Sequence, residues 1–183
     1  MTKGYRKGTG WRGGSWVTRV LCCLLIGLAP AQTQAEDIYQ IKAAFIYNFT
    51  KFVTWPEEME QRGGDLRLCI FDRNPFGEYL YQLSGRKVRN FELKVVQPAS
   101  LSELDGCDIL FVAGSAKTDT VLRGLTNHPV LTVSDQSGFV QDGGVIELLS
   151  ENNRIRFDIN LQAVRDSGLQ MSSKLLQLAR QVR

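Results

Sequence analysis

A chain of 183 residues with 22 basic and 19 acidic side chains carries a formal net charge of +3. Residues 1–35 hold five of the basic residues and no acidic residue, so the rest of the chain has 17 basic against 19 acidic residues. Residues 36–183 have no excess of basic side chains, so their charge gives no support for nucleic-acid binding. Their number fits one domain with a hydrophobic core of useful size.

The first 35 residues have the order of a secretory signal. Basic residues come first, an apolar run follows over 20–29, and small residues close the segment over 30–35. A membrane-spanning helix needs ~20 apolar residues, so an uncleaved anchor is disfavoured. We expect a Sec-type signal peptide over 1–35, cleaved after Ala35 or, as the competitor, after Ala31. Residues 36–183 would then lie in the periplasm and would not span the membrane.

Residues 37–52 are predicted to form a helix with apolar side chains on two sides. A stop is expected at Pro56, because the residue before a proline disfavours helical geometry. Such a helix is either deeply buried, which is the commoner case, or shared between a core and a partner. The two stripes are Ile38, Ile41, Phe45, Phe49 and Phe52, and then Tyr39, Ala43, Ile46 and Val53.

Strands and helices then alternate, which is typical of parallel βαβ units. A polar loop is expected over 57–64, with strands over 66–71, 91–96, 108–113 and 129–133, and helices over 75–83 and 115–125. A hairpin follows over 145–149 and 155–159, then a helix capped by Asn160 and a last helix started by Ser172 or Ser173, with Met171, Leu175, Leu178 and Val182 as its apolar stripe. The predicted fold is a single compact α/β domain with a mostly parallel central sheet flanked by helices, a late β-hairpin and two C-terminal helices.

Catalytic groups are scarce in this sequence. The single histidine, His128, lies in a turn composition before a strand, so no Ser-His-Asp arrangement or histidine-rich metal site can be built around it. Gly143 and Gly144 precede a strand, whereas a phosphate-binding glycine loop follows one. We expect no enzyme, no metal and no cofactor.

Polar residues do gather where the strands end. In open parallel sheets, ligands bind outside the carboxyl ends of the strands. Asp72, Arg73, Ser115, Ser134 and Asp135 follow strands in this way. No base with an orienting partner is among them, and the stretch from Ser134 is favoured as a turn in which Asp135 bonds backbone amides and Gly138 takes a positive φ. Arg73, or Arg156 of the late strand, is the candidate holder of an anion.

The strand over 155–159 carries a second polar cluster. Arg154, Arg156, Asp158 and Asn160 alternate along it with apolar residues, so one face is charged. An ordinary solvent-exposed strand face is the interpretation favoured for this cluster over a binding site. Two arginines at this spacing can also bind a carboxylate, a phosphate or an acidic patch of a partner.

Cys69 and Cys107 are the two cysteines of residues 36–183. An exported protein lives where disulfides persist, so a bond between them is chemically allowed. Both lie in apolar runs, however, and two buried thiols in strands are the equal alternative.

Several stretches together resemble the YfiR family, over nearly all of residues 36–183. They are IKAAFIYNFTKFVTWP (41–56), LCI (68–70), NPFG (74–77), CDILFV (107–112), VLTVSD (130–135), GF (138–139), IRFDINL (155–161) and SSKLL (172–176). The resemblance implies a non-enzymatic periplasmic regulator that represses an inner-membrane diguanylate cyclase by binding its periplasmic domain, which lowers cyclic-di-GMP and biofilm formation. It also implies an outer-membrane lipoprotein as a second partner. A further cysteine pair that the family has near the late hairpin is missing over 145–156, so its redox role is not expected here.

We therefore expect a protein-binding surface on the first helix and the arginine-bearing strand. A self-complementary use of the helix would give a homodimer. The alternative is a periplasmic small-molecule sensor that holds an anion in the strand-end cleft. The candidate residues are Tyr47, Phe49, Phe52, Trp55, Arg73, Arg154, Arg156 and Asn160.

Overall fold

The computed structural model describes residues 32–114, 117–125, 128–152 and 154–183. An eight-stranded sheet, in the order β10-β8-β7-β6-β5-β2-β4-β3, forms its centre. The predicted α/β fold with a mostly parallel sheet is confirmed. The strands are β2 (Gly64–Phe71), β3 (Lys87–Val88), β4 (Phe91–Val96), β5 (Ile109–Val112), β6 (Leu131–Ser134), β7 (Ile146–Glu151), β8 (Arg154–Ile159) and β10 (Gln181–Val182), with β1 (Val53–Thr54) and β9 (Gln170–Met171) forming a separate two-stranded sheet.

The central strands β4, β2, β5, β6 and β7 run parallel. Strand β3 is antiparallel to β4, and β8 is antiparallel to β7 but parallel to β10. Every residue of β5 and β6 is buried, as in a parallel sheet that is covered on both faces. The predicted hairpin is present as β7 and β8, with Leu148 opposite Phe157 in the register.

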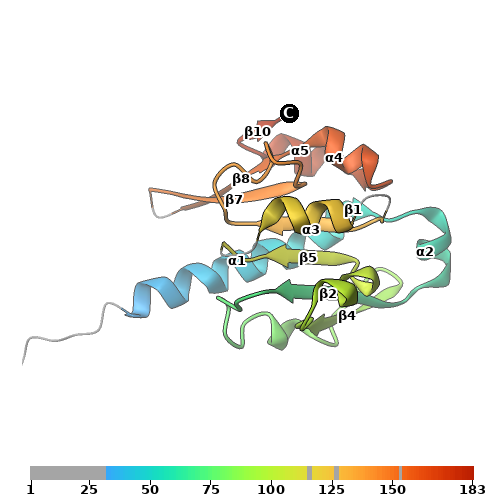
Figure 1. Cartoon of the computed structure of the whole chain (residues 1–183), viewed down its shortest axis with the longest axis horizontal. Helices are drawn as coiled ribbons and strands as arrows, with labels where there is room; N and C mark the ends of the chain where they lie inside the picture. The colour runs from blue at the N-terminus through green and yellow to red at the C-terminus, as the bar shows by residue number, and fades with distance from the viewer. Residues whose placement is uncertain (1–31, 115–116, 126–127, 153) are drawn as a thin grey trace, which may run out of the picture. The chain divides into compact units, whose positions relative to one another are not determined.

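Helices cover both faces of the sheet, with α1 (Gln32–Phe52) behind it in Figure 1 and α3 (Thr118–Gly124) in front. The larger core lies between α1 and the sheet and includes Ile46, Phe49 and Phe157. The smaller core lies on the α3 side and includes Val121 and Phe139. The remaining helices are α2 (Glu57–Arg62), α4 (Leu161–Asp166) and α5 (Ser173–Leu178), with short 3-10 helices η1 (Tyr81–Leu83) and η2 (Leu101–Gly106).

The segment after β2 differs most from prediction. No helix forms over 75–80, and only η1 follows. The reason is local, because the Asn74 side chain accepts a hydrogen bond from the Phe76 backbone N–H at 2.9 Å and donates to the Gly77 carbonyl at 3.0 Å. Gly77 then takes φ 54°, which a right-handed helix cannot contain.

Other boundaries also shift. The expected loop over 57–64 contains α2, which Gly63 ends at φ 60°. The last helix ends at Leu178, so Val182 lies in β10 and the predicted stripe is not one helical face. The predicted cap Asn160 is confirmed, and of the two predicted starts of the last helix, Ser172 is the cap. The start of α1 lies before the expected Asp37. Most of the predicted signal peptide and Ser115 fall outside the described residues.

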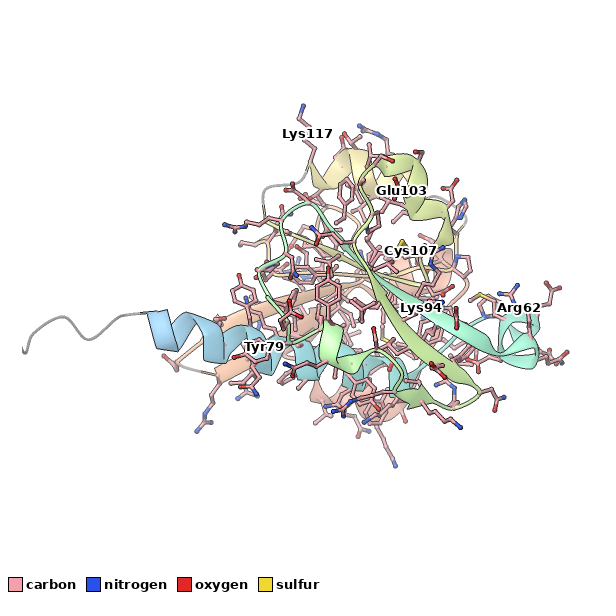
Figure 2. All side chains as sticks on the ribbon, turned by 90° about the horizontal axis from the view of Figure 1, so that it is seen from below. Arg62, Tyr79, Lys94, Glu103, Cys107 and Lys117 are labelled. Atoms are coloured by element: carbon pink, nitrogen blue, oxygen red, sulfur yellow. A yellow bond between two sulfur atoms is a disulfide. The ribbon has the colours of Figure 1, made fainter. Side chains whose placement is uncertain are left out.

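Cys69 and Cys107 form a disulfide, with 5.8 Å between their Cα atoms (Figure 2 labels Cys107). Cys69 lies on β2, and Cys107 comes just before β5, the strand that pairs with β2. Both cysteines are buried in the smaller core. Of the two interpretations left open by the sequence, the bond is the one that the structure contains.

Candidate functional site

The strand order reverses between β2 and β5, because the chain passes from β2 outward to β4 and then returns to the other side of β2. Ligands of open α/β sheets bind at such a switch point, outside the carboxyl ends of the strands. Asp72 follows β2 here with φ 71°, a left-handed conformation that aspartate tolerates better than most residues. Arg73 comes next and is exposed, as the strand-end argument expects.

Asp135 is the second predicted residue at this end of the sheet, and its partners come from α1. Its carboxylate accepts a hydrogen bond from Lys42 Nζ at 2.6 Å and one from the Tyr39 hydroxyl at 3.0 Å. The Lys42 and Asp135 side chains are only 8% and 12% exposed. Losing either one would leave a nearly buried charge without its partner, so this pair fixes α1 to the end of β6. Burial, and then the charge of Asp135, raise the pKa of Tyr39 to about 12.

The predicted turn after β6 is present with different partners. Gly138 has φ 87° as expected. The backbone amides of Gly138 and Val140 donate to the Glu147 carboxylate, not to Asp135. The sequence argument placed the wrong carboxylate in the turn, because Glu147 lies on the neighbouring strand β7 and is close only in the fold.

A hollow of about 770 Å3 lies beside Tyr39 and the loop over 73–79. Phe76 is 1% exposed and meets the edges of Tyr39 and Phe111, with centroids 5.4 and 4.6 Å away. Arg73 lines the hollow, and it forms no hydrogen bond or ion pair within the described part of the chain. The hollow therefore has a rigid aromatic wall and a guanidinium available for an anion.

A second hollow of about 380 Å3 continues along α1 and shares Tyr79 and Gln82 with the first. Tyr47, a predicted site residue, lines it. Lys51 Nζ lies 4.2 Å from the Tyr47 ring centroid, and the Arg86 guanidinium lies 5.5 Å from it. Cation–π contacts thus place two positive charges at this end of α1.

Phe49 and Trp55, which were predicted as partner contacts, have their side chains in the core. Phe49 is 1% exposed and packs on Phe157 with 5.0 Å between centroids. Trp55 is 2% exposed, and its Nε1 donates to the Asp108 carbonyl at 3.3 Å. Phe52 is half-buried beside the same core. Phe49 and Trp55 therefore have the core role that was the alternative to partner contact.

Arg154 and Arg156 are exposed on β8, and neither forms a hydrogen bond or an ion pair with any residue that the structure describes. Arg180 crosses the same face, with Nε donating to Asp158 at 2.8 Å and Nη1 to Glu151 at 2.5 Å. These partners, Asp158 first, raise the pKa of Arg180 above its ordinary value. The hairpin is therefore held to the C-terminal segment, while its two other arginines face solvent.

The side chain of Asn160, the last predicted site residue, forms hydrogen bonds within the fold. Its Oδ1 accepts from the Ala163 backbone N–H, and its Nδ2 donates to the Val140 carbonyl, both at 2.9 Å. Within the described ranges, no three His, Cys, Asp or Glu side chains are grouped to hold a metal ion. No helix in the same ranges is long and apolar enough to cross a bilayer.

Comparison with known proteins gives one family. A family model described as YfiR/HmsC-like matches residues 39–180. Among solved structures, the ABC domain in complex with L-Trp from Streptococcus pneumonia superposes with a TM-score of 0.49 at 11% identity, over 79% of this chain and 60% of that one. A conserved domain protein from Vibrio cholerae O1 biovar El Tor strain N16961 gives 0.48 at 8% identity, over the same shares. This chain spans 60% of each of those chains, and similarity at this level carries no functional argument.

Proposed function

The chain belongs to the YfiR/HmsC-like family, and from this premise we propose that it represses an inner-membrane diguanylate cyclase by binding the cyclase's periplasmic domain. Membership supports a periplasmic regulator of cyclic-di-GMP signalling, and not an enzyme, as the general class. The cyclase as direct partner and the outer-membrane lipoprotein come from the resemblance, the homodimer comes from the self-complementary use of the first helix, and all three belong to the proposal.

One observation carries the choice of surface, namely two hairpin arginines that form no ion pair with any residue among those that the structure describes. Arg154 and Arg156 lie two residues apart on one exposed strand face. A guanidinium recognises carboxylates through two parallel hydrogen bonds, and arginine is enriched at the energetic centres of interfaces. The pair therefore fits an acidic patch on a partner protein.

Rigidity of this surface supports the same proposal. Arg180 ties Glu151 of β7 and Asp158 of β8 to the C-terminal segment, and the opposite face of the hairpin packs on α1 through Phe157. A surface that is ordered before binding loses less conformational entropy when the partner docks. Repression needs only a difference in affinity between the active and inactive cyclase, and no chemical step.

The test is cyclic-di-GMP in the native host. Deletion of the gene is expected to raise it, and an exported copy should restore the low level, whereas a copy without residues 1–35 should not. Arg154→Glu with Arg156→Glu should fail to restore it, because both side chains would repel an acidic patch. The matched control, Arg165→Glu with Lys174→Glu, changes the net charge equally at exposed sites on α4 and α5 and should restore it.

No rise on deletion would refute the repressor. Full restoration by the hairpin variant would refute the surface while leaving the repressor in place. Immunoblots of the periplasmic fraction establish that the variants accumulate to equal amounts.

A further inference from the structure

The two hollows lie next to each other along α1, since Tyr79 and Gln82 line both, and together they are called the groove, with α1 on one side and residues 73–86 on the other. Tyr79, which lines both hollows, is labelled in Figure 2 and lies beside α1. Along α1 the groove runs from Tyr39 to Lys51. At 1.5 Å per helical residue this is about 18 Å, the length of five or six residues of extended chain. Such a length suits a polypeptide segment better than a compact small molecule.

The charge of the groove selects the kind of segment. Its lining includes the cations Arg73, Lys51 and Arg86 and a single acid, Glu78. Arg73 lies in the 770 Å3 hollow, and Lys51 and Arg86 lie in the 380 Å3 hollow. Acidic side chains spaced along a bound segment would meet a cation at each end.

The uncharged lining favours close contact. Tyr39, Tyr47 and Tyr79 supply aromatic surface, and tyrosine and arginine are the residue types that dominate binding energy at interfaces. Ala43 and Ala44 line the α1 side, where small side chains allow another backbone to approach. The wall is preorganised by the Asn74 hydrogen bonds and by the Lys42–Asp135 pair behind Tyr39.

We propose that this groove binds an acidic, extended segment of another protein, between α1 and residues 73–86. A second copy of this chain is a poor occupant, because a two-fold contact would bring the same cations face to face. The groove lining contains neither Arg154 nor Arg156. The inference is therefore independent of the hairpin surface and of the repression of a cyclase.

Site-specific photo-crosslinking of the full chain in its native host tests the proposal. Gln82, which lines both hollows, is replaced by p-benzoyl-phenylalanine, and the exposed Gln177 of α5 is replaced in a matched control. The expected result is a crosslink specific to position 82 whose partner peptide, sequenced by mass spectrometry, has an excess of Asp and Glu. Adding Arg73→Glu with Arg86→Glu should lower the crosslink yield at least tenfold, whereas Arg165→Glu with Lys174→Glu should leave it unchanged.

Three outcomes would overturn the proposal. The first is no crosslink at position 82 above that at position 177. The second is a partner peptide without acidic excess, a second copy of this chain, a lipid or a small molecule. The third is an unchanged yield in the variant with both groove arginines reversed. None of these depends on the cyclic-di-GMP level, so the failure of this inference and that of the proposed function are separate results.

Discussion

Replacing Cys69 and Cys107 together by alanine is expected to lower the free energy of unfolding by about 4 kcal/mol. The disulfide closes a loop with a sequence separation of 38, and its loss returns that loop entropy to the unfolded chain, which the chain-entropy relation puts at about 4 kcal/mol. For a domain of this size, each kcal/mol corresponds to about 2–4 °C in Tm. The double variant should therefore melt roughly 8–16 °C lower.

Urea unfolding followed by tryptophan fluorescence measures this change. Trp55 is the only tryptophan of residues 36–183 and is 2% exposed, so it reports loss of the core. The wild type in dithiothreitol should match the double alanine variant, and dithiothreitol should leave that variant unchanged. A double alanine variant whose free energy of unfolding lies within about 1 kcal/mol of that of the oxidised wild type would show that loop closure does not stabilise this fold.

Two further predictions concern Tyr39 and Trp55. The pKa of Tyr39 is raised from 10.0 to about 12, so its contribution to stability is complete below pH 10 and is lost as pH rises through 12. Urea titrations should show a steeper fall in the free energy of unfolding over this window in the wild type than in Tyr39→Phe, and equal slopes would contradict a pKa of Tyr39 that is raised by burial and then by Asp135. Trp55→Phe should cost about 1–3 kcal/mol of unfolding free energy, because Nε1 no longer donates to Asp108 and a void remains, and Trp55→Ala about 3–5. If both substitutions lowered the free energy of unfolding by the same amount, the contributions of the Trp55 hydrogen bond and of its ring could not be separated.

Many helices and strands could be predicted from the sequence because their apolar residues follow a clear pattern. Strand β5 is a continuous apolar run, β6 alternates apolar residues with Thr132 and Ser134, and the structure buries every residue of both strands. The caps Asn160 and Ser172 were also correct, since capping depends on residues three positions apart. Local signals of this kind need no knowledge of the rest of the fold.

Segments decided by side-chain competition were not predictable. Asp72, Asn74 and Pro75 have the composition of a helix start, but Asn74 bonds both Phe76 and Gly77 and closes a turn. The same residue types serve both purposes, and only the surrounding packing selects between them.

The site was predicted in part. Strand-end reasoning placed Arg73 and Asp135 at the same end of the sheet, and the structure agrees. It missed Lys42 and Tyr39, which close that end from 93 and 96 positions away in the chain. A signal was present, since Lys42 is a cation between two apolar stripes of a helix that had to be buried. Its partner could not be named before the fold placed α1 on β6.

The two surfaces proposed here share one helix, and this links them physically. One side of α1 lines the groove through Tyr47, and its buried side packs on Phe157 of the hairpin through Phe49. The hairpin presents Arg156 on its other face. A segment that binds the groove and shifts α1 must therefore act on the support of the hairpin. Thermodynamic reciprocity then requires that any change in affinity for a hairpin partner is matched by an equal change in affinity for the groove segment.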